Sequence, residues 1–519
     1  MYQKSIFSKI VPRFGRFILD VKASTTGNPF RDYWVRGSFR QGEHLFIAEG
    51  FYNGEQTYTI RFMPLFEGEW NFSITSNCPE MDGITGHFLC QGIKGHGPVT
   101  VDDTFAFTHF DGTPYYPVGT TAYGWSSQKE SLLQETLQSL QNAPFNKIRM
   151  SPLPKHYLHS LNEPDLFPFE GGRNADFQEI AAPFTGRDGK GYTFDFSRPN
   201  ITYWRKFDHL VECLEQMEIQ CDLIFFHFYD RWGFSTMTVE DRVAYIRYVC
   251  ARYGAYAHIW WSLANEWDLL RWPESEWEVC AKTLVDADPY HHLCSIHNGI
   301  SLYDPARPWI THLSLQLSPY GIQDTEKLRE KYQKPVVWDE IGYEGDIEEF
   351  FGDLPPERLV HRAWSAVIRG GYFSHGETYQ HPYDEIFWAK GGKLVGRSIP
   401  RIAFLRRVLE NAPGVPVPQK GVYYGHGGCL LAGHRILEET NGDDFPHPDF
   451  GSWMLFYLGY CQPAVRTFTL PHNTQYCLQL LDTWEMTATA LSGTYSGTFK
   501  ISLPSKPYLA LLCTEIQSS

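Results

Sequence analysis

Two glutamates end apolar stretches of the chain and are spaced so that they can act on one bond. Glu266 ends the run of residues 258–266, and Glu340 ends the run of residues 335–340. Hydrolysis of a glycosidic bond requires two carboxyl groups, one to protonate the leaving oxygen and one to attack the anomeric carbon or activate water. The pair therefore predicts cleavage of a glycosidic bond, with Glu266 and Glu340 as the catalytic groups.

The middle of the chain alternates short apolar runs with longer amphipathic runs. We predict eight strands, at residues 116–121, 147–150, 221–226, 259–264, 293–297, 312–317, 336–338 and 371–374. Helical patterns lie between them, at residues 129–141, 203–217, 239–253, 274–286 and 355–368. Eight alternating strands favour a (β/α)8 barrel. A doubly wound sheet is the competing fold, but no glycine-rich phosphate loop follows the first strand.

A barrel of this kind carries its functional groups at the C-terminal ends of its strands. Glu266 then follows strand four and Glu340 ends strand seven, on opposite sides of the barrel mouth. Other polar or aromatic side chains fall at or just after the strand ends. We expect these to bind the substrate: Tyr123, Trp125, Arg149, His227, Asn265, His297, Gln316, Glu377 and Trp388.

Two stretches rich in proline and glycine divide the chain, at residues 95–98 and 412–419. Such residues interrupt regular structure, so we predict domains at residues 1–97, 98–411 and 412–519. The outer two contain short alternating runs separated by turn residues, which is typical of β-sandwiches. The sequence thus predicts a multidomain α/β plus all-β protein, with a central TIM barrel flanked by N- and C-terminal antiparallel β-sandwiches.

Composition narrows the classes of partner. Lys and Arg number 45 against 60 Asp and Glu, and the net charge of −15 gives no electrostatic basis for binding nucleic acid or an anionic membrane surface. No apolar run is long enough to span a membrane or to form a signal peptide core. The 11 cysteines show no paired framework. We read them as reduced thiols and expect a cytoplasmic protein.

Several segments resemble the clan-A retaining glycoside hydrolases. Residues 260–266, WWSLANE, are similar to the strand-four Asn-Glu motif, and residues 336–342, VVWDEIG, to the strand-seven nucleophile segment. Residues 146–149 are similar to the strand-two arginine segment. Residues 117–125 resemble the cellulase-like and apiosidase-like bacterial branch, and the outer pieces resemble the β-sandwiches of such enzymes.

The resemblance implies a retaining double displacement, with Glu266 as general acid/base and Glu340 as nucleophile. It also implies that Asn265 contacts the sugar 2-hydroxyl and that Arg149 keeps Glu340 ionised. The family's strand-six tyrosine is not evident, because Gln316 stands there. A cytoplasmic enzyme would meet short oligosaccharides or glycosides. A long aromatic-rich loop after strand two, from residue 151 to about 199, favours a lid and exo-acting cleavage.

Two alternatives remain at this stage. A non-catalytic carbohydrate-binding protein on a degenerate barrel would keep the aromatic residues without needing both carboxylates. A metal-dependent hydrolase or lyase would use His227, His297 and His375, yet their spacing matches no zinc motif. We expect no metal, no cofactor and no nucleic-acid or membrane partner, and the sequence leaves a homo-oligomer open.

Overall fold

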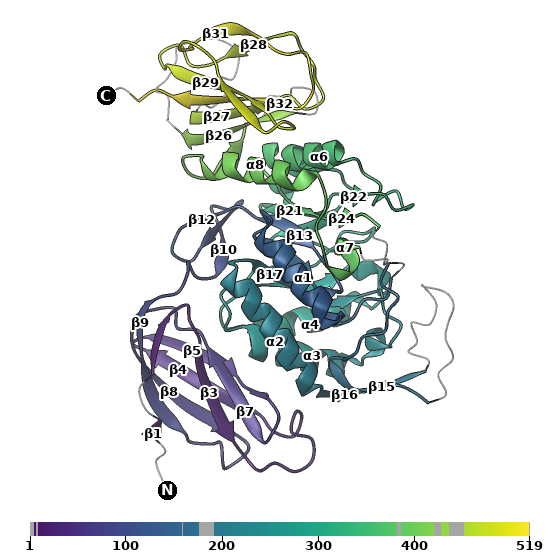
Figure 1. The fold of residues 1–519 in the computed structure, drawn as a ribbon. Coiled ribbons are helices and arrows are strands. Elements are labelled where there is room, and N and C mark those ends of the chain that lie inside the picture. Colours follow the sequence, from purple (N-terminus) through teal and green to yellow (C-terminus); the bar gives the residue numbers. More distant parts are fainter. Residues whose placement is uncertain are drawn as a thin grey trace.

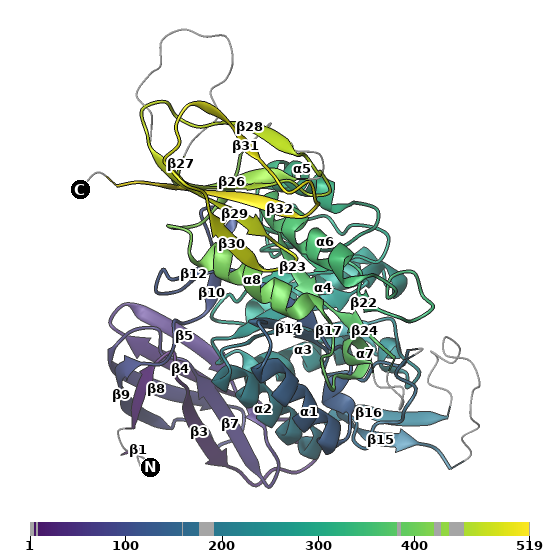
Figure 2. The ribbon, with the colours of Figure 1, turned by 45° about the horizontal axis from the view of Figure 1, so that its top comes forward.

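The computed structural model describes residues 5–6, 9–157, 159–175, 191–380, 386–419, 427–434 and 451–517. A parallel barrel forms the centre, and β-rich regions cover two opposite sides of it (Figures 1 and 2). The predicted TIM barrel with flanking β-sandwiches is confirmed. Within the described residues, no helix combines the length and apolar character that crossing a membrane requires.

The barrel strands pair in parallel, in the order β19-β18-β17-β14-β13-β23-β21-β20. Their bounds are β13 (Val118–Thr121), β14 (Lys147–Met150), β17 (Gln220–His227), β18 (Ile259–Asn265), β19 (Cys294–Ser295), β20 (Leu313–Gln316), β21 (Val336–Glu340) and β23 (Tyr372–His375). A parallel bridge between His297 and Ser314 joins the two outermost strands. The barrel is therefore nearly closed, and each predicted strand overlaps an observed one.

Helices cover the outside of the barrel. They are α1 (Glu130–Gln141), α2 (Ile201–Gln216), α3 (Val239–Tyr253), α4 (Glu274–Ala287), α5 (Thr325–Tyr332), α6 (Pro356–Ile368), the short α7 (Phe387–Lys390) and α8 (Ser398–Glu410). Short 3-10 turns are η1 (Trp125–Ser127), η2 (Phe234–Thr236), η3 (Trp267–Leu269) and η4 (Ile322–Asp324). The connection from β19 to β20 is fully described and contains no helix. Pro305 and Pro308 lie within it, and proline disfavours a helix interior.

The N-terminal region packs two sheets face to face. One contains β1 (Ser5–Ile6), β2 (Ile10–Arg13), β4 (Val35–Gln41), β5 (His44–Glu49), β8 (Gly68–Ser76) and β9 (Thr85–Ile93); the other contains β3 (Phe17–Lys22), β6 (Phe51–Tyr52) and β7 (Thr57–Phe62). Buried and exposed residues alternate along β3, so its buried side chains face the core between the sheets. Asp208 on α2 joins this region to the barrel, since it pairs with Arg61 at 2.8 Å and Arg252 at 2.7 Å.

A small antiparallel sheet covers the N-terminal end of the barrel. It contains β10 (Val99–Asp102), β11 (Ala106–His109) and β12 (Pro114–Tyr115). The Phe107 ring lies 5.1 Å from the Trp260 ring and 5.0 Å from the Tyr372 ring, measured between centroids. This sheet closes the barrel floor and leaves the opposite end as the mouth.

The C-terminal region packs on α6 and α8 (Figure 1). Its larger sheet contains β25 (Val417–Pro418), β26 (Gly428–His434), β27 (Gly451–Tyr457), β29 (Tyr476–Asp482), β30 (Thr487–Ala490) and β32 (Leu509–Glu515), and β28 (Val465–Thr469) pairs with β31 (Thr498–Ser502). The Tyr457 ring stacks on Trp364 of α6 at 5.2 Å. Arg401 of α8 donates to the Trp484 carbonyl at 3.0 Å. The sandwich thus rests directly on two barrel helices.

The predicted long loop after strand two contains secondary structure of its own. An antiparallel pair, β15 (Phe169–Arg173) and β16 (Tyr192–Pro199), occupies its second half. Residues 158 and 176–190 lie outside the described part. A second short pair, β22 (Glu344–Gly345) with β24 (Glu377–Thr378), lies beyond strands seven and eight.

Candidate active site

Glu340, at the end of β21, is held by a tyrosine from another strand. The Tyr123 hydroxyl, two residues after β13, donates to Glu340 Oε1. Arg149 Nη1 donates to the same hydroxyl oxygen at 3.4 Å. The structure therefore links Arg149 to Glu340 through Tyr123. The sequence placed Tyr123 among the substrate-binding residues and did not foresee that it holds Glu340.

A charged layer lies beneath this tyrosine. Lys147 Nζ is 2.9 Å from Asp222 and 2.7 Å from Asp339, and Arg149 Nε is 3.4 Å from Asp222. All four side chains are almost completely buried. Burial favours a neutral Asp339, but Lys147 and Arg149 outweigh it and hold the pKa of this carboxyl well below its usual range. Two positive and two negative groups thus balance one another and fix the end of β21.

Glu266 follows β18 directly and adopts a left-handed backbone conformation, with φ +52°. Asn265 Nδ2 donates to Glu266 Oε2 at 3.2 Å, and Gln316 Nε2 lies 3.5 Å from Oε1. The Tyr229 hydroxyl hydrogen-bonds the same carboxyl group. Asn265 and Gln316, both predicted as substrate contacts, therefore meet at Glu266. The Gln316 side chain thus lies at the Glu266 side of the barrel mouth and not at the Glu340 side.

The two carboxyl groups influence one another electrostatically. Burial and the negative charge of Glu340 raise the pKa of Glu266 to about 7. Hydrogen bonding from Tyr229 and the charge of Lys155 oppose this rise. Glu266 therefore keeps its proton in slightly acidic solution and is close to half-protonated at neutral pH. This protonation behaviour suits a group that gives up a proton and later takes one back.

Lys155 is a feature of the site that the sequence did not reveal. Its Nζ lies 3.9 Å from the ring centroid of Tyr123, 4.2 Å from Tyr229, 5.0 Å from Trp388 and 5.2 Å from Tyr157. Only 6% of the residue is exposed. We call these four rings the aromatic box.

The charge of Lys155 is balanced by the glutamates. Burial lowers the pKa of Lys155 to about 8, although the charges of Glu266 and Glu340 oppose this fall. The residue follows Pro152 and Pro154 in an irregular segment, where no strand or helix period indicates which way a side chain points. The one available signal was its position a few residues after strand two.

Two tryptophans predicted to bind the substrate are almost completely buried. Trp388 is 4% exposed and forms one wall of the aromatic box. Trp125 is completely buried in the barrel core, and its indole N–H points to Met150 Sδ at 3.2 Å. The prediction for Trp125 is wrong, because η1 turns its side chain beneath the mouth and leaves no ring face for a sugar.

None of the predicted histidines hydrogen-bonds Glu266 or Glu340 within the described residues, although the charge of Glu340 acts on His297. His227 Nε2 lies 3.2 Å from the Leu153 carbonyl, and burial lowers the pKa of His227 to about 3. Burial likewise lowers the pKa of His297 to about 4. His375 stacks on Phe145 at 4.7 Å, outside the barrel interior. His227 and His297 are therefore neutral at physiological pH.

Glu377 has its carboxylate fully engaged by the backbone. Its two oxygens accept N–H groups from Val395 at 2.6 Å and Gly396 at 2.8 Å. The neighbouring Glu344 accepts two N–H groups at the start of α8, at 2.7 and 3.0 Å. The structure thus does not bring Glu377 to the Glu266–Glu340 pair. It anchors a loop, and this corrects the expectation of a substrate contact.

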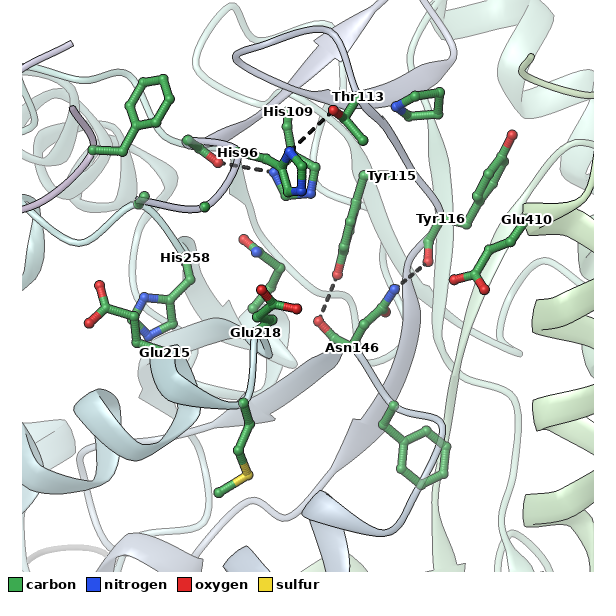
Figure 3. Close-up of a pocket in the computed structure, with 18 of the residues that line it drawn as sticks. His96, His109, Thr113, Tyr115, Tyr116, Asn146, Glu215, Glu218, His258 and Glu410 are labelled. Atoms are coloured by element: carbon green, nitrogen blue, oxygen red, sulfur yellow. Dashed lines mark hydrogen bonds between the residues drawn. The ribbon is translucent and has the colours of Figure 1, made fainter. Parts of the chain in front are cut away.

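A cavity of about 710 Å³ lies at the opposite end of the barrel, beside β12 (Figure 3). Its lining includes Tyr115, Asn146, Glu218, His258 and Glu410, and the Tyr115 hydroxyl donates to the Asn146 carbonyl at 2.8 Å. Neither catalytic candidate lines this cavity. This cavity is therefore separate from the glutamate pair.

Comparison with known families agrees with this geometry. The model of the apiosidase-like catalytic domain matches residues 102–382, more than half of the chain. Two domains of unknown function match on either side, DUF5060 at residues 10–77 and DUF5605 at residues 446–514. No curated protein matches the chain.

Solved structures give the same picture. A Bacteroides vulgatus protein provisionally classed as a glycoside hydrolase is 34% identical, with 98% of this chain and 100% of that chain covered and a TM-score of 0.87. A family 5 glycoside hydrolase from the same species is 16% identical over 81% of this chain and 94% of its own, with a TM-score of 0.59, which shows the likeness of fold. The chain belongs to the apiosidase-like family and is a glycoside hydrolase.

Proposed function

We propose that the chain cleaves terminal sugars from short glycosides with net retention of anomeric configuration. The observation that carries this proposal is the different surroundings of the two glutamates. Glu266 has a pKa of about 7, raised by burial and by the charge of Glu340. Glu340 is held by Tyr123, with Arg149 behind it. One group is thus suited to donate a proton and the other to attack.

In the first half-reaction, a Glu340 oxygen forms a bond to the anomeric carbon as the bond from that carbon to the leaving oxygen breaks. The proton of Glu266 moves to the leaving oxygen. Tyr123 orients Glu340 for attack. Asn265 lies beside Glu266, where its amide can meet the sugar 2-hydroxyl.

In the second half-reaction, Glu266 is ionised and accepts a proton from water. The water oxygen bonds to the anomeric carbon, and the ester bond to Glu340 breaks. Both groups return to their starting states. In the ester, Glu340 carries no charge and no longer raises the pKa of Glu266, so Glu266 can be ionised at the pH at which it first served as acid.

The preference for terminal sugars and short substrates has separate support. The segment after β14 supplies Lys155 and Tyr157, and α7 supplies Trp388, so one side of the mouth is walled. All 11 cysteines are free thiols, as expected in a reducing compartment. In the cytoplasm the substrates would be imported glycosides and not polymers.

The test is a panel of aryl glycosides that includes β-glucoside, β-xyloside, β-galactoside, α-L-arabinofuranoside and β-apioside, with Glu340→Ala as the blank. Proton NMR of the first-formed sugar reports its anomeric configuration before mutarotation. We expect release that is lost in Glu340→Ala and a first product with the substrate's configuration. An inverted first product would contradict retention, and release unaffected by Glu340→Ala would contradict the assigned nucleophile.

A further inference from the structure

Lys155 is a buried cation whose donors have no partner in the described protein. A lysine ammonium carries three N–H donors. Among the described residues, none accepts a hydrogen bond from Lys155 Nζ, and no carboxylate lies within ion-pair distance of it. Its contacts are the faces of the aromatic box. A cation over such faces is attracted by the negative face of each ring.

The aromatic box connects this cation to both glutamates. Two of its rings belong to Tyr123 and Tyr229, which are also the rings nearest to Nζ. The Tyr123 hydroxyl binds Glu340, and the Tyr229 hydroxyl binds Glu266. One ammonium therefore lies on a tyrosine that holds Glu340 and on a tyrosine that holds Glu266, and its charge acts on both carboxyl groups.

Charge counting shows why this position matters. In the layer beneath, Lys147 and Arg149 are balanced by Asp222 and Asp339. Lys155 is then the positive charge that remains for the glutamate pair. With Glu266 protonated and Glu340 ionised, the charges of Lys155, Glu266 and Glu340 sum to zero.

The first half-reaction moves the negative charge from one glutamate to the other. Glu340 becomes a neutral ester, and Glu266 becomes a carboxylate. Lys155 and the pair again sum to zero, provided that the ammonium stays charged. A cation in direct contact with one glutamate would favour one half-reaction, whereas one held between them by uncharged rings serves both.

We propose that Lys155 is a shared counter-ion, a positioning residue that stabilises whichever of Glu266 and Glu340 carries the negative charge. This inference rests on the proposed function. The other titratable groups facing Lys155 are Arg149, His227 and the phenols of the box. His227 is neutral because burial lowers its pKa to about 3, and burial raises the pKa of each of the three phenols far above neutral.

The first measurement needs no substrate. In an infrared pH titration, the carboxyl signal that disappears in Glu266→Gln reports Glu266. We expect its midpoint to rise from about 7 to about 8 in Lys155→Met, because the opposing positive charge is lost. Lys155→Gln is the second variant, should the first not fold. The matched control is Lys334→Met, which removes a half-buried lysine that donates to the Pro305 and Arg307 carbonyls. An unchanged midpoint in the folded variants would overturn the proposal.

The second measurement separates the half-reactions with whichever aryl glycoside the parent enzyme cleaves. The burst of released phenol reports the first step, and steady-state turnover of an activated substrate reports the second. We expect the pH below which the second step slows to rise by about one pH unit in Lys155→Met, because Glu266 must be ionised to act as base and the ammonium favours its ionised form. Loss of rate without a change in pH dependence would indicate a merely structural role and overturn the proposal.

The two hypotheses fail in different ways. A shifted Glu266 midpoint in a protein that cleaves no glycoside would contradict the proposed function and leave the electrostatic role intact. Hydrolysis that depends on both glutamates, with a midpoint that Lys155→Met does not move, would contradict only the role of Lys155.

Discussion

Glu266 and Glu377 are two carboxyl groups beyond the ends of barrel strands, and loss of solvent around them raises the pKa of both, to about 7 and about 8 respectively. They differ in what their oxygens contact and in their access to solvent. Glu266 contacts side chains and is partly exposed to solvent. Glu377 is 1% exposed and accepts hydrogen bonds from two backbone N–H groups. A raised pKa is thus common to a reactive carboxyl group and to a structural one.

The difference lies in what each group can still bind. Glu266 is held by the side chains of Asn265, Gln316 and Tyr229, and part of its surface remains open to solvent. Glu377 serves the loop before α8, and Glu344 beside it serves the start of that helix. Access to an incoming sugar, together with the raised pKa, distinguishes the catalytic candidate.

The largest effect should come from amide substitutions that leave shape unchanged. We expect Glu340→Gln to lower kcat/KM by about 10³-fold or more, because the nucleophile is lost. Glu377→Gln should keep kcat/KM within about threefold for the folded enzyme. Rates on the aryl glycoside panel, with circular dichroism as the check of folding, test this. Equal losses of kcat/KM in Glu340→Gln and Glu377→Gln would contradict the distinction between a catalytic and a structural carboxyl group.

Glu266→Ala should depend on the leaving group. We expect a loss of about 10²- to 10⁴-fold for a poorly activated glycoside, because proton donation is lost. For a dinitrophenyl glycoside the first step needs no acid, so added azide should restore turnover and yield a glycosyl azide of retained configuration. The same loss for both leaving groups, with no azide product, would argue against Glu266 as acid/base.

Stability in alkaline solution should rise when the Glu266 carboxyl group is removed. The pKa of Glu266 is higher in the folded state, so the wild type loses stability as pH rises from about 4.5 through about 7. Glu266→Gln removes that loss, and should raise the free energy of unfolding at pH 8 by about 3 kcal/mol relative to wild type. Denaturant titrations at pH 5 and pH 8 measure this effect, and a Glu266→Gln variant that is no more stable than wild type at pH 8 would contradict the raised pKa of Glu266.

The smallest effect concerns pH dependence. kcat/KM should fall above about pH 7 as Glu266 loses its proton. The Tyr229 hydroxyl lowers the pKa of Glu266, so Tyr229→Phe should move this fall to higher pH by a few tenths of a pH unit up to about one. The control is Tyr253→Phe, which removes a buried hydroxyl on α3. A fall that stays in place in Tyr229→Phe, or moves equally in both variants, would count against this hydrogen bond.

The sequence was sufficient to predict the barrel, because its buried strands are continuous apolar runs whose ends are easy to see. It located Glu266 and Glu340 for the same reason. It did not show which way a side chain points after a strand ends. Trp125 and Glu377 were therefore expected at the barrel mouth. The structure places the Trp125 side chain in the barrel core and bonds Glu377 to the backbone of the loop before α8.

Contacts between segments that lie far apart in the sequence could not be predicted either. The box around Lys155 draws on three loops and one short helix, and no local period links them. Between residues 297 and 312 the sequence shows no helical pattern, and the structure has no helix between β19 and β20, where Pro305 and Pro308 lie.

The stacking of Tyr457 on Trp364 has a consequence for modularity. The C-terminal sandwich shields the apolar outer faces of α6 and α8, and its core is continuous with theirs. A barrel expressed without residues 412–519 would expose the apolar faces of α6 and α8 to water, and we expect it to self-associate. The start of α8 is tied to Glu344, so disorder there would spread toward strands seven and eight. The catalytic unit that can be transplanted or engineered therefore extends beyond the barrel itself.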